Sequence, residues 1–278
     1  MRTLTHDGRG PFQLALKSDA PGIVDIRIGD DATASVTLEP LNPGDTVAAR
    51  LIEAATAVSG DEFRVTIPGT PGGNTTVVQD RSGTHVTMVA GTVTGSMTGV
   101  TITGNGNIVV GGNVVNGVVN GQVINSGGIV NGGGIRATVR LPRTCDSVDV
   151  DTTSADITTS GELRTITTRT MSGDIVVGTA TEAAQVRTSS GDVTIGATPA
   201  ASITTMSGDI TLLDLAATAR LKTMSGDIRV QVTSDATVDA NTMSGDIRLT
   251  ADQGVTVTSK LRTMSGRIID RTNGGGRR

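Results

Sequence analysis

Aliphatic and polar residues alternate through the C-terminal half of the chain, and a recurring Ser-Gly-Asp tripeptide interrupts the alternation at regular intervals. The serines of successive copies are 17 to 21 residues apart. A period this short, with so many β-branched residues and glycines, is typical of a β-solenoid, in which each coil adds one layer to parallel sheets. The seven copies are Ser154-Ala155-Asp156, the five that begin at Ser172, Ser190, Ser207, Ser225 and Ser244, and Ser265-Gly266-Arg267.

With each serine as position 0, the same residue types recur in phase on both sides. Position −2 is Thr in all seven coils, and positions −4, +3 and +5 are mostly aliphatic. This period of two predicts two strands per coil, with these four positions facing inward and Ser-Gly forming the corner between the strands. Glycine supplies backbone freedom there, and Asp can accept from nearby N–H groups in an Asx-type turn. The inward threonine hydroxyls can bond one another from coil to coil.

Position +2 forms a row of six aspartates: Asp156, Asp174, Asp192, Asp209, Asp227 and Asp246. Neighbouring carboxylates about 5 Å apart repel by roughly 1 kcal/mol even at the dielectric of water. The basic residues that can offset this repulsion stand at position −3 (Arg169, Arg187, Lys222, Arg262) or at position +4 (Arg229, Arg248). We interpret the row as a structural turn ladder. A calcium track is the alternative, but the Gly-Gly-x-Gly-x-Asp repeat of calcium-binding β-rolls is absent.

Methionines occupy position −1 in five of the seven coils: Met171, Met206, Met224, Met243 and Met264. Strand parity directs them away from the core, which would make an apolar stripe along one edge and a candidate interface. In the alternative, the chain bends at the corner and the flexible thioethers fill gaps in the core.

The remainder of the chain divides by composition. Residues 1–69 predict a β-rich head with strands over 11–16, 23–28, 33–39 and 63–67, and with one helix over 47–58 that is opened by Pro43-Gly44-Asp45-Thr46. Residues 70–135 are rich in Gly, Asn and Val, with Asn-Gly turn signals, and fit either irregular coils or a flexible insertion. The regular β-solenoid spans 136–270 with coils of about 18 residues, and 271–278 form a flexible tail.

Composition excludes several functions. The 278 residues include 23 basic and 27 acidic side chains, no Trp or Tyr and two Phe. Without aromatic residues for base stacking, nucleic-acid binding is not expected. A single cysteine, Cys145, and two histidines predict no disulfide, no His-rich metal site and no cofactor. No apolar run reaches membrane-spanning length, and residues 1–7 lack a signal region. We therefore expect a cytoplasmic protein, placed at the cell surface only by a route that the sequence does not reveal.

Catalytic chemistry is not indicated. Glycoside hydrolysis needs two carboxylates with different environments, whereas a uniform ladder gives each aspartate the same surroundings. Cys145 has no recognisable base nearby in the sequence, so we predict that it is a small buried thiol. We expect a non-catalytic protein, with a carbohydrate-active or calcium-binding β-helix as the alternative.

The hexapeptide Thr170-Met171-Ser172-Gly173-Asp174-Ile175 and its copies through Ile247 follow head strands, an Ala-rich helix and a strand that ends in Ile67-Pro68. This combination resembles the bacterial β-strand-repeat putative adhesin family, a family of unknown function. The resemblance implies a right-handed β-helix without a known catalytic centre. It suggests a rigid, adhesin-like scaffold that binds an unknown protein partner or associates with itself.

Overall fold

The computed structural model describes residues 1–6, 11–69 and 134–272 in full. Between 70 and 133 it describes only the backbone of short strands: β7 (Thr75–Asp80), β8 (Gly83–Met88), β9 (Val93–Thr94), β10 (Ile108–Val109), β11 (Gly117–Val119) and β12 (Gln122–Ile124). The two interpretations of 70–135 therefore concern a segment that lies mostly outside the described residues, and so does most of the predicted tail.

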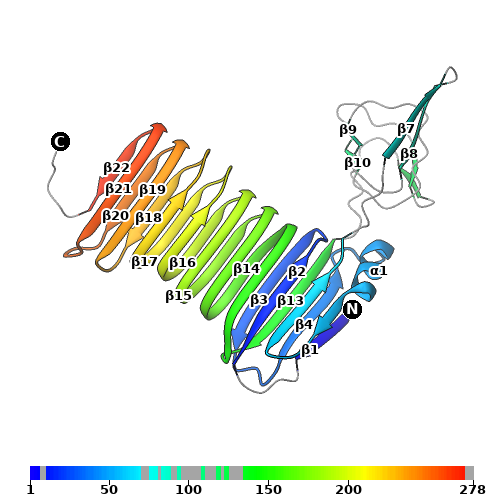
Figure 1. The fold of residues 1–278 in the computed structure, drawn as a ribbon, viewed down its shortest axis with the longest axis horizontal. Helices are drawn as coiled ribbons and strands as arrows, with labels where there is room; N and C mark the ends of the chain where they lie inside the picture. Colours follow the sequence, from blue (N-terminus) through cyan, green and yellow to red (C-terminus); the bar gives the residue numbers. More distant parts are fainter. Residues whose placement is uncertain are drawn as a thin grey trace.

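The repeat region winds into a β-solenoid, as predicted (Figure 1). Each strand from β14 to β20 pairs in parallel with the equivalent strand one coil later, so that Ile175, Val193 and Ile210 lie side by side in three successive coils. The longer strands bend around the turns without losing their pairing. The strands are β14 (Cys145–Ser172), β15 (Ile175–Ser190), β16 (Val193–Thr204), β17 (Ile210–Lys222), β18 (Ile228–Val232), β19 (Ala236–Ser244), β20 (Ile247–Ala251), β21 (Val257–Ser265) and β22 (Ile268–Arg271).

Short aliphatic side chains fill the interior of the rod. Position +3 is fully buried from Ile157 to Ile247, and the position −2 threonines of the first six coils are buried as well. The inward assignment made from the period of two is therefore confirmed. Phe12 and Phe63, the two aromatic side chains of the chain besides its histidines, lie buried in the head.

The head is built on the same plan as the repeat. Its elements are β1 (Arg2–His6), β2 (Phe12–Ser18), β3 (Gly22–Gly29), β4 (Ala34–Pro40), α1 (Thr46–Ala54), β5 (Thr56–Val58), β6 (Glu62–Ile67) and β13 (Ile135–Pro142). Strands β2 and β3 both pair in parallel with β14, and so form one more coil. Strands β6 and β13 pair in parallel with β2 and β3, and form the layer before that coil. Sheet pairing thus runs unbroken from the head into the repeat.

Residues 68–134 are inserted at one corner of this first layer. Where later coils turn through Ser-Gly-Asp, the chain leaves the layer after Ile67 and re-enters it at Ile135. Both ends are tied to the neighbouring coil: Asp19 N donates to Ile67 O at 3.0 Å, and Ile135 N donates to Pro21 O at 2.9 Å. The segment therefore begins and ends beside the corner row of the solenoid.

Antiparallel strands and the helix close the N-terminal end of the rod. Strand β4 pairs antiparallel with β13, and β1 pairs antiparallel with β4. Asp45, within the predicted opening segment Pro43-Gly44-Asp45-Thr46, caps α1 by accepting from the N–H groups of Val47 and Ala48. The helix stops at Ala54 rather than at Val58, because Ala55 adopts an extended conformation and the residues after it pair with β6.

Candidate interaction surface

The corner glycines let successive coils approach closely. In the six coils from Gly173 to Gly266 the corner glycine has a φ between +122° and +150°. A Cβ added there would lie less than 3.0 Å from the carbonyl oxygen of the corner residue one coil earlier. From the sequence, backbone freedom alone explained the glycine at each corner. The structure adds a second requirement, because no side chain fits between the stacked corners.

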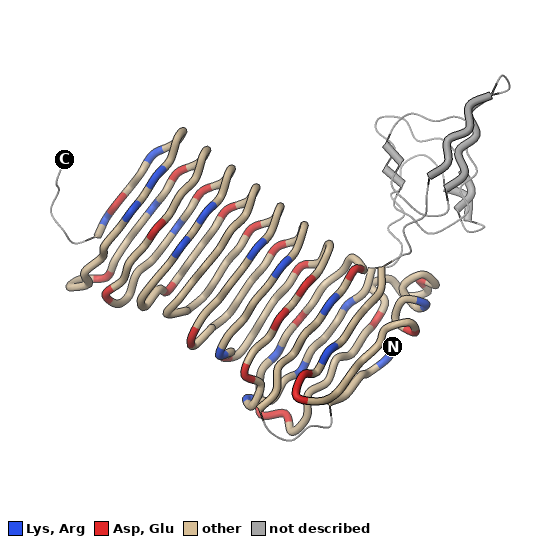
Figure 2. The backbone as a smooth tube through the Cα atoms, viewed as in Figure 1, with Lys and Arg blue, Asp and Glu red and all other residues tan. Residues whose placement is uncertain are grey.

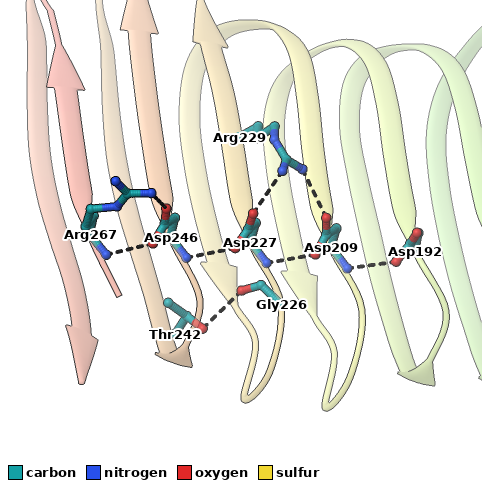
Figure 3. Close-up of polar contacts among 8 residues, drawn as sticks. All are labelled: Asp192, Asp209, Gly226, Asp227, Arg229, Thr242, Asp246 and Arg267. Carbon is teal, nitrogen blue, oxygen red and sulfur yellow. Dashed lines mark hydrogen bonds and ion pairs between the residues drawn. The ribbon is translucent and has the colours of Figure 1, made fainter. Parts of the chain in front are cut away.

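The aspartates at position +2 link the coils to one another (Figure 3). The backbone N–H of each aspartate from Asp174 to Asp246 donates to Oδ1 of the aspartate one coil earlier, at 2.8 to 3.0 Å. In the last coil, Arg267 N donates to Asp246 in the same way at 2.8 Å and holds the pKa of that carboxyl below its ordinary value. The carboxylates thus bond the following coil, whereas the sequence suggested a local Asx-type turn.

Charge repulsion along the ladder is offset by Arg229 at position +4 and by Arg267 in the last coil. Arg248, the other basic residue at position +4, forms no ion pair with a residue that the structure describes. Arg229 bridges two carboxylates, with N–O distances of 3.0 Å to Asp209 and 2.9 Å to Asp227. Arg267 reaches Asp246 at 3.3 Å. At position −3, Arg169 instead pairs with Asp149 at 3.2 Å, so the predicted compensation from that row is wrong for this residue. Figure 2 shows the acidic and basic residues in rows along the rod.

The ladder gives a direct prediction for Asp174, whose Oδ1 accepts from Asp192 N at 2.9 Å. Asp174→Ala removes this acceptor, and we expect the free energy of unfolding to fall by about 1 kcal/mol. Asp174→Asn keeps an acceptor oxygen and relieves repulsion, so we expect a change within about 0.5 kcal/mol. Urea unfolding with and without Ca²⁺ measures both. A loss for Asp174→Asn that appears only with Ca²⁺ would instead support a metal track.

The threonine hydroxyls do not bond one another as the sequence suggested. In the coils from Thr170 to Thr242 each hydroxyl donates to the carbonyl oxygen of the corner serine two residues later, at 2.8 to 3.2 Å. The corner turns this carbonyl toward the hydroxyl, whereas the next threonine lies a full layer away, about 4.8 Å. The buried hydroxyl of Thr152 has no partner among the described residues. The threonines therefore hold the corner closed from inside.

The five methionines at position −1 point away from the core. The exposed fractions are 64% for Met171, 56% for Met206, 43% for Met224, 47% for Met243 and 81% for Met264. Strand parity predicted this direction, and the alternative in which the methionines fill the core is wrong. These five residues make up what we call the methionine stripe.

Next to the C-terminal half of the stripe lies a groove of about 730 Å³. Three stripe methionines line it together with Leu261 and Ile268, and basic side chains line it from position −3. The residues that line the groove include the apolar side chains of Met224, Met243, Met264 and Ile268 and the basic side chains of Lys222 and Arg262. No acidic residue lines the groove among the residues that the structure describes.

Cys145 is a buried thiol, as expected. Its Sγ donates to Ser147 O at 3.4 Å, and burial raises its pKa to about 11. The thiolate needed for nucleophilic attack is thus disfavoured at neutral pH. Within the described part of the chain, no three His, Cys, Asp or Glu side chains gather closely enough to hold a metal ion. The same residues include no helix with the length and apolar character needed to cross a membrane.

Comparison with known proteins agrees with this architecture. The model of the Toastrack DUF4097 family matches residues 70–272. The crystal structure of a putative adhesin from Bacteroides fragilis is similar in fold, with a TM-score of 0.52 and 14% identity over 97% of each chain. No curated protein matches the sequence. These matches confirm the resemblance inferred from the repeated hexapeptide. Because the family model covers well over half of the residues, the chain belongs to the Toastrack DUF4097 family.

Proposed function

We propose that the protein is a non-catalytic scaffold that binds a protein partner through the methionine stripe. The observation that supports this most strongly is the in-phase exposure of five methionines, each between 43% and 81% exposed. Contiguous apolar surface on a folded protein commonly marks an interaction site. Methionine suits such a surface because its unbranched thioether adapts to different apolar partners.

The solenoid holds the stripe in a fixed line. Layers about 4.8 Å apart place Met171 and Met264, five layers apart, at the ends of a row about 24 Å long. The corner serines beside the stripe pair from coil to coil, as Ser190 does with Ser207 and Ser207 with Ser225. The glycine and aspartate rows fix the same corners. A partner therefore meets a preformed surface and orders little of this chain on binding.

The chemistry of the ladder supports a non-catalytic role. Five of its carboxylates, from Asp156 to Asp227, each accept the N–H of the next aspartate, and Asp246 accepts that of Arg267. Acid–base catalysis by a carboxylate pair needs one protonated and one ionised member, held apart by different environments. Each carboxylate of the ladder accepts a backbone N–H in the same way, and the ion pairs to Arg229 and Arg267 add a cation beside three of them, so no feature of the ladder sets one carboxylate apart as the protonated member.

Replacing Met206, Met224 and Met243 together with Gln tests the proposal. Gln has similar length but a polar end, so we expect the melting temperature to stay close to that of the wild type while partner binding falls. Binding is measured by using the wild-type and variant rods as bait in an extract of the source cell, with bound proteins identified by mass spectrometry.

Leu213→Gln is the matched control. Leu213 is 55% exposed but lies off the stripe, so this variant should retain the wild-type partners. If the triple variant captured the same proteins as the wild type, the stripe would not be the interface. If it unfolded at a much lower temperature, the exposed methionines would be needed for stability, which would contradict their assignment as a binding surface.

A further inference from the structure

The last coil presents backbone groups whose equivalents in the preceding coils are bonded. In the preceding layers, Thr223 N donates to Asn241 O at 3.0 Å and Met224 O accepts from Ser244 N at 3.0 Å. Gly226 N and Ile228 N each donate to the next coil at 2.9 Å. The equivalent groups of the last coil have no partner among the described residues: Thr263 N, Met264 O, Gly266 N and Ile268 N. They form an open parallel edge, which is a template for an added strand.

Apolar surface is also uncovered at this edge. Ile268 is 45% exposed, whereas Ile228 and Ile247, at the same position in earlier coils, are fully buried. Leu261 is half-buried, whereas Leu221 at its position is buried. Asp270 accepts from Ser259 Oγ at 3.0 Å on the far side of the same layer, where position +5 is aliphatic in the five preceding coils. The polar pair of Ser259 and Asp270 makes that part of the edge unfavourable for an apolar strand. An added strand therefore fits over residues 261–268.

The charge of the edge selects the strand. Position +2 is occupied by Arg267 in this coil, after aspartates in the six before it, and its side chain is 82% exposed. At position −3 stands Arg262, which forms no ion pair with any residue that the structure describes. An incoming strand lies within side-chain reach of both guanidinium groups. Carboxylates at its own −3 and +2 positions would pair with them.

The same features disfavour a second copy of this chain as the occupant. At the N-terminal end the outermost strand, β1, pairs antiparallel with β4, and α1 contacts β4 and β6, so this end does not present the parallel coil that a head-to-tail stack would continue. Two C-terminal edges facing each other would bring Arg262 and Arg267 against the same residues of the second copy, and like charges directly opposite are destabilising.

We propose that the C-terminal edge binds an extended acidic segment of a partner protein as one further parallel strand. Backbone pairing with the corner from Thr263 to Ile268 provides affinity, and apolar residues of the segment cover Leu261 and Ile268. Its acidic residues face Arg262 and Arg267, which set the specificity. Met264 belongs both to this edge and to the methionine stripe, and Met224 and Met243 share a groove with residues of the edge, whereas Met171 and Met206 lie three or more coils away. Variants of those two methionines therefore separate this proposal from the proposed function.

A synthetic peptide tests the proposal. The probe is Val-Glu-Thr-Val-Ser-Gly-Glu-Ile with blocked ends and a fluorescent label, and its control has Lys in place of both Glu. We expect the Glu peptide to bind the full chain about tenfold more tightly than the Lys peptide, since the Glu peptide gains two solvent-exposed charge pairs of modest strength and the Lys peptide gains none. Fluorescence anisotropy at low and high salt measures both, and the preference should weaken in high salt.

The variant Arg262→Glu/Arg267→Glu should reverse the preference in favour of the Lys peptide, with thermal melting as the check on folding. The Met171→Gln/Met206→Gln variant changes stripe residues outside both the groove and the edge, and it should bind the Glu peptide like the wild type, which separates this proposal from the proposed function. Equal binding of the two peptides, or binding of neither, would overturn it. Binding only after removal of residues 273–278 would also overturn it, by assigning the edge to the chain's own tail.

Discussion

Gly226→Ala is expected to lower the free energy of unfolding by about 3–5 kcal/mol, a large part of the stability of a typical domain. The new Cβ would lie less than 3.0 Å from the carbonyl oxygen of Gly208. Neither corner can move freely, because Gly208 N donates to Ser225 O and Gly226 N donates to Ser244 O in the following coils. The φ of +138° at Gly226 adds the strain of an L-residue in a region that favours glycine. Relief would require the two coils to separate at the corner, which breaks the aspartate bond beside it.

Two other glycines separate these contributions. Gly254 has a φ of +83° with nothing within 4 Å of an added Cβ, so Gly254→Ala should show the backbone strain alone, about 1–2 kcal/mol. Gly60 has open space and no positive φ, so Gly60→Ala should leave stability unchanged or raise it by up to about 1 kcal/mol. Urea unfolding of the three variants measures the series. Equal effects at Gly226 and Gly254 would contradict the close-approach argument.

The sequence predicted the repeat region well because strand parity and coil period act locally. A period of two on each side of Ser-Gly assigns −2 and +3 inward and −1 outward, and burial agrees at Thr242, Ile228 and Met206. The exposure of the methionines follows from the same parity. Features that depend on one residue and its near neighbours along the chain could therefore be predicted from the sequence.

The place of the head in the solenoid was hidden because coil stacking uses backbone groups and needs no motif. The β2–β3 coil turns through residues 19–22, and no Ser-Gly-Asp marks it. Only Gly22 stands where the later corners have glycine, and it shows the same close approach, to Ile135 O of the previous layer. The insertion of residues 68–134 into a corner also separates β6 from β13 in the sequence, so their common layer is invisible to a search for a fixed period.

The inter-coil role of the aspartates was missed because it depends on the distance between layers. A carboxylate can reach a local N–H or the one above it, and residue type does not distinguish the two. The replacement of aspartate by Arg267 in the last coil was the one sequence feature that pointed to this inter-coil role. An acceptor at position +2 is needed only where another coil follows, and the last regular coil is the one that lacks it.

Ile228→Asp is expected to unfold the rod or to lower its free energy of unfolding by at least about 4 kcal/mol, because it exchanges a buried alkyl group for an unpaired carboxylate. Ile228 is fully buried at the middle of the stack, between Ile210 and Ile247 in the neighbouring coils. Val176→Asp is the control, since Val176 is 42% exposed on the outward side of its strand. Its effect should stay within about 1 kcal/mol.

The pH dependence of the Ile228→Asp variant identifies charge burial as the cause. Burial raises the pKa of the introduced carboxyl in the folded state above its unfolded value of about 3.9. As pH rises past that value, the unfolded chain releases its proton first, and each further pH unit favours unfolding by about 1.4 kcal/mol until the folded pKa is reached. The variant should therefore be markedly more stable at pH 4 than at pH 7, relative to the wild type. Urea midpoints at the two pH values measure this difference, and Ile228→Asn, which is polar but does not titrate, should show none of it. A wild-type midpoint for Ile228→Asp at pH 7 would mean that position +3 does not face the core.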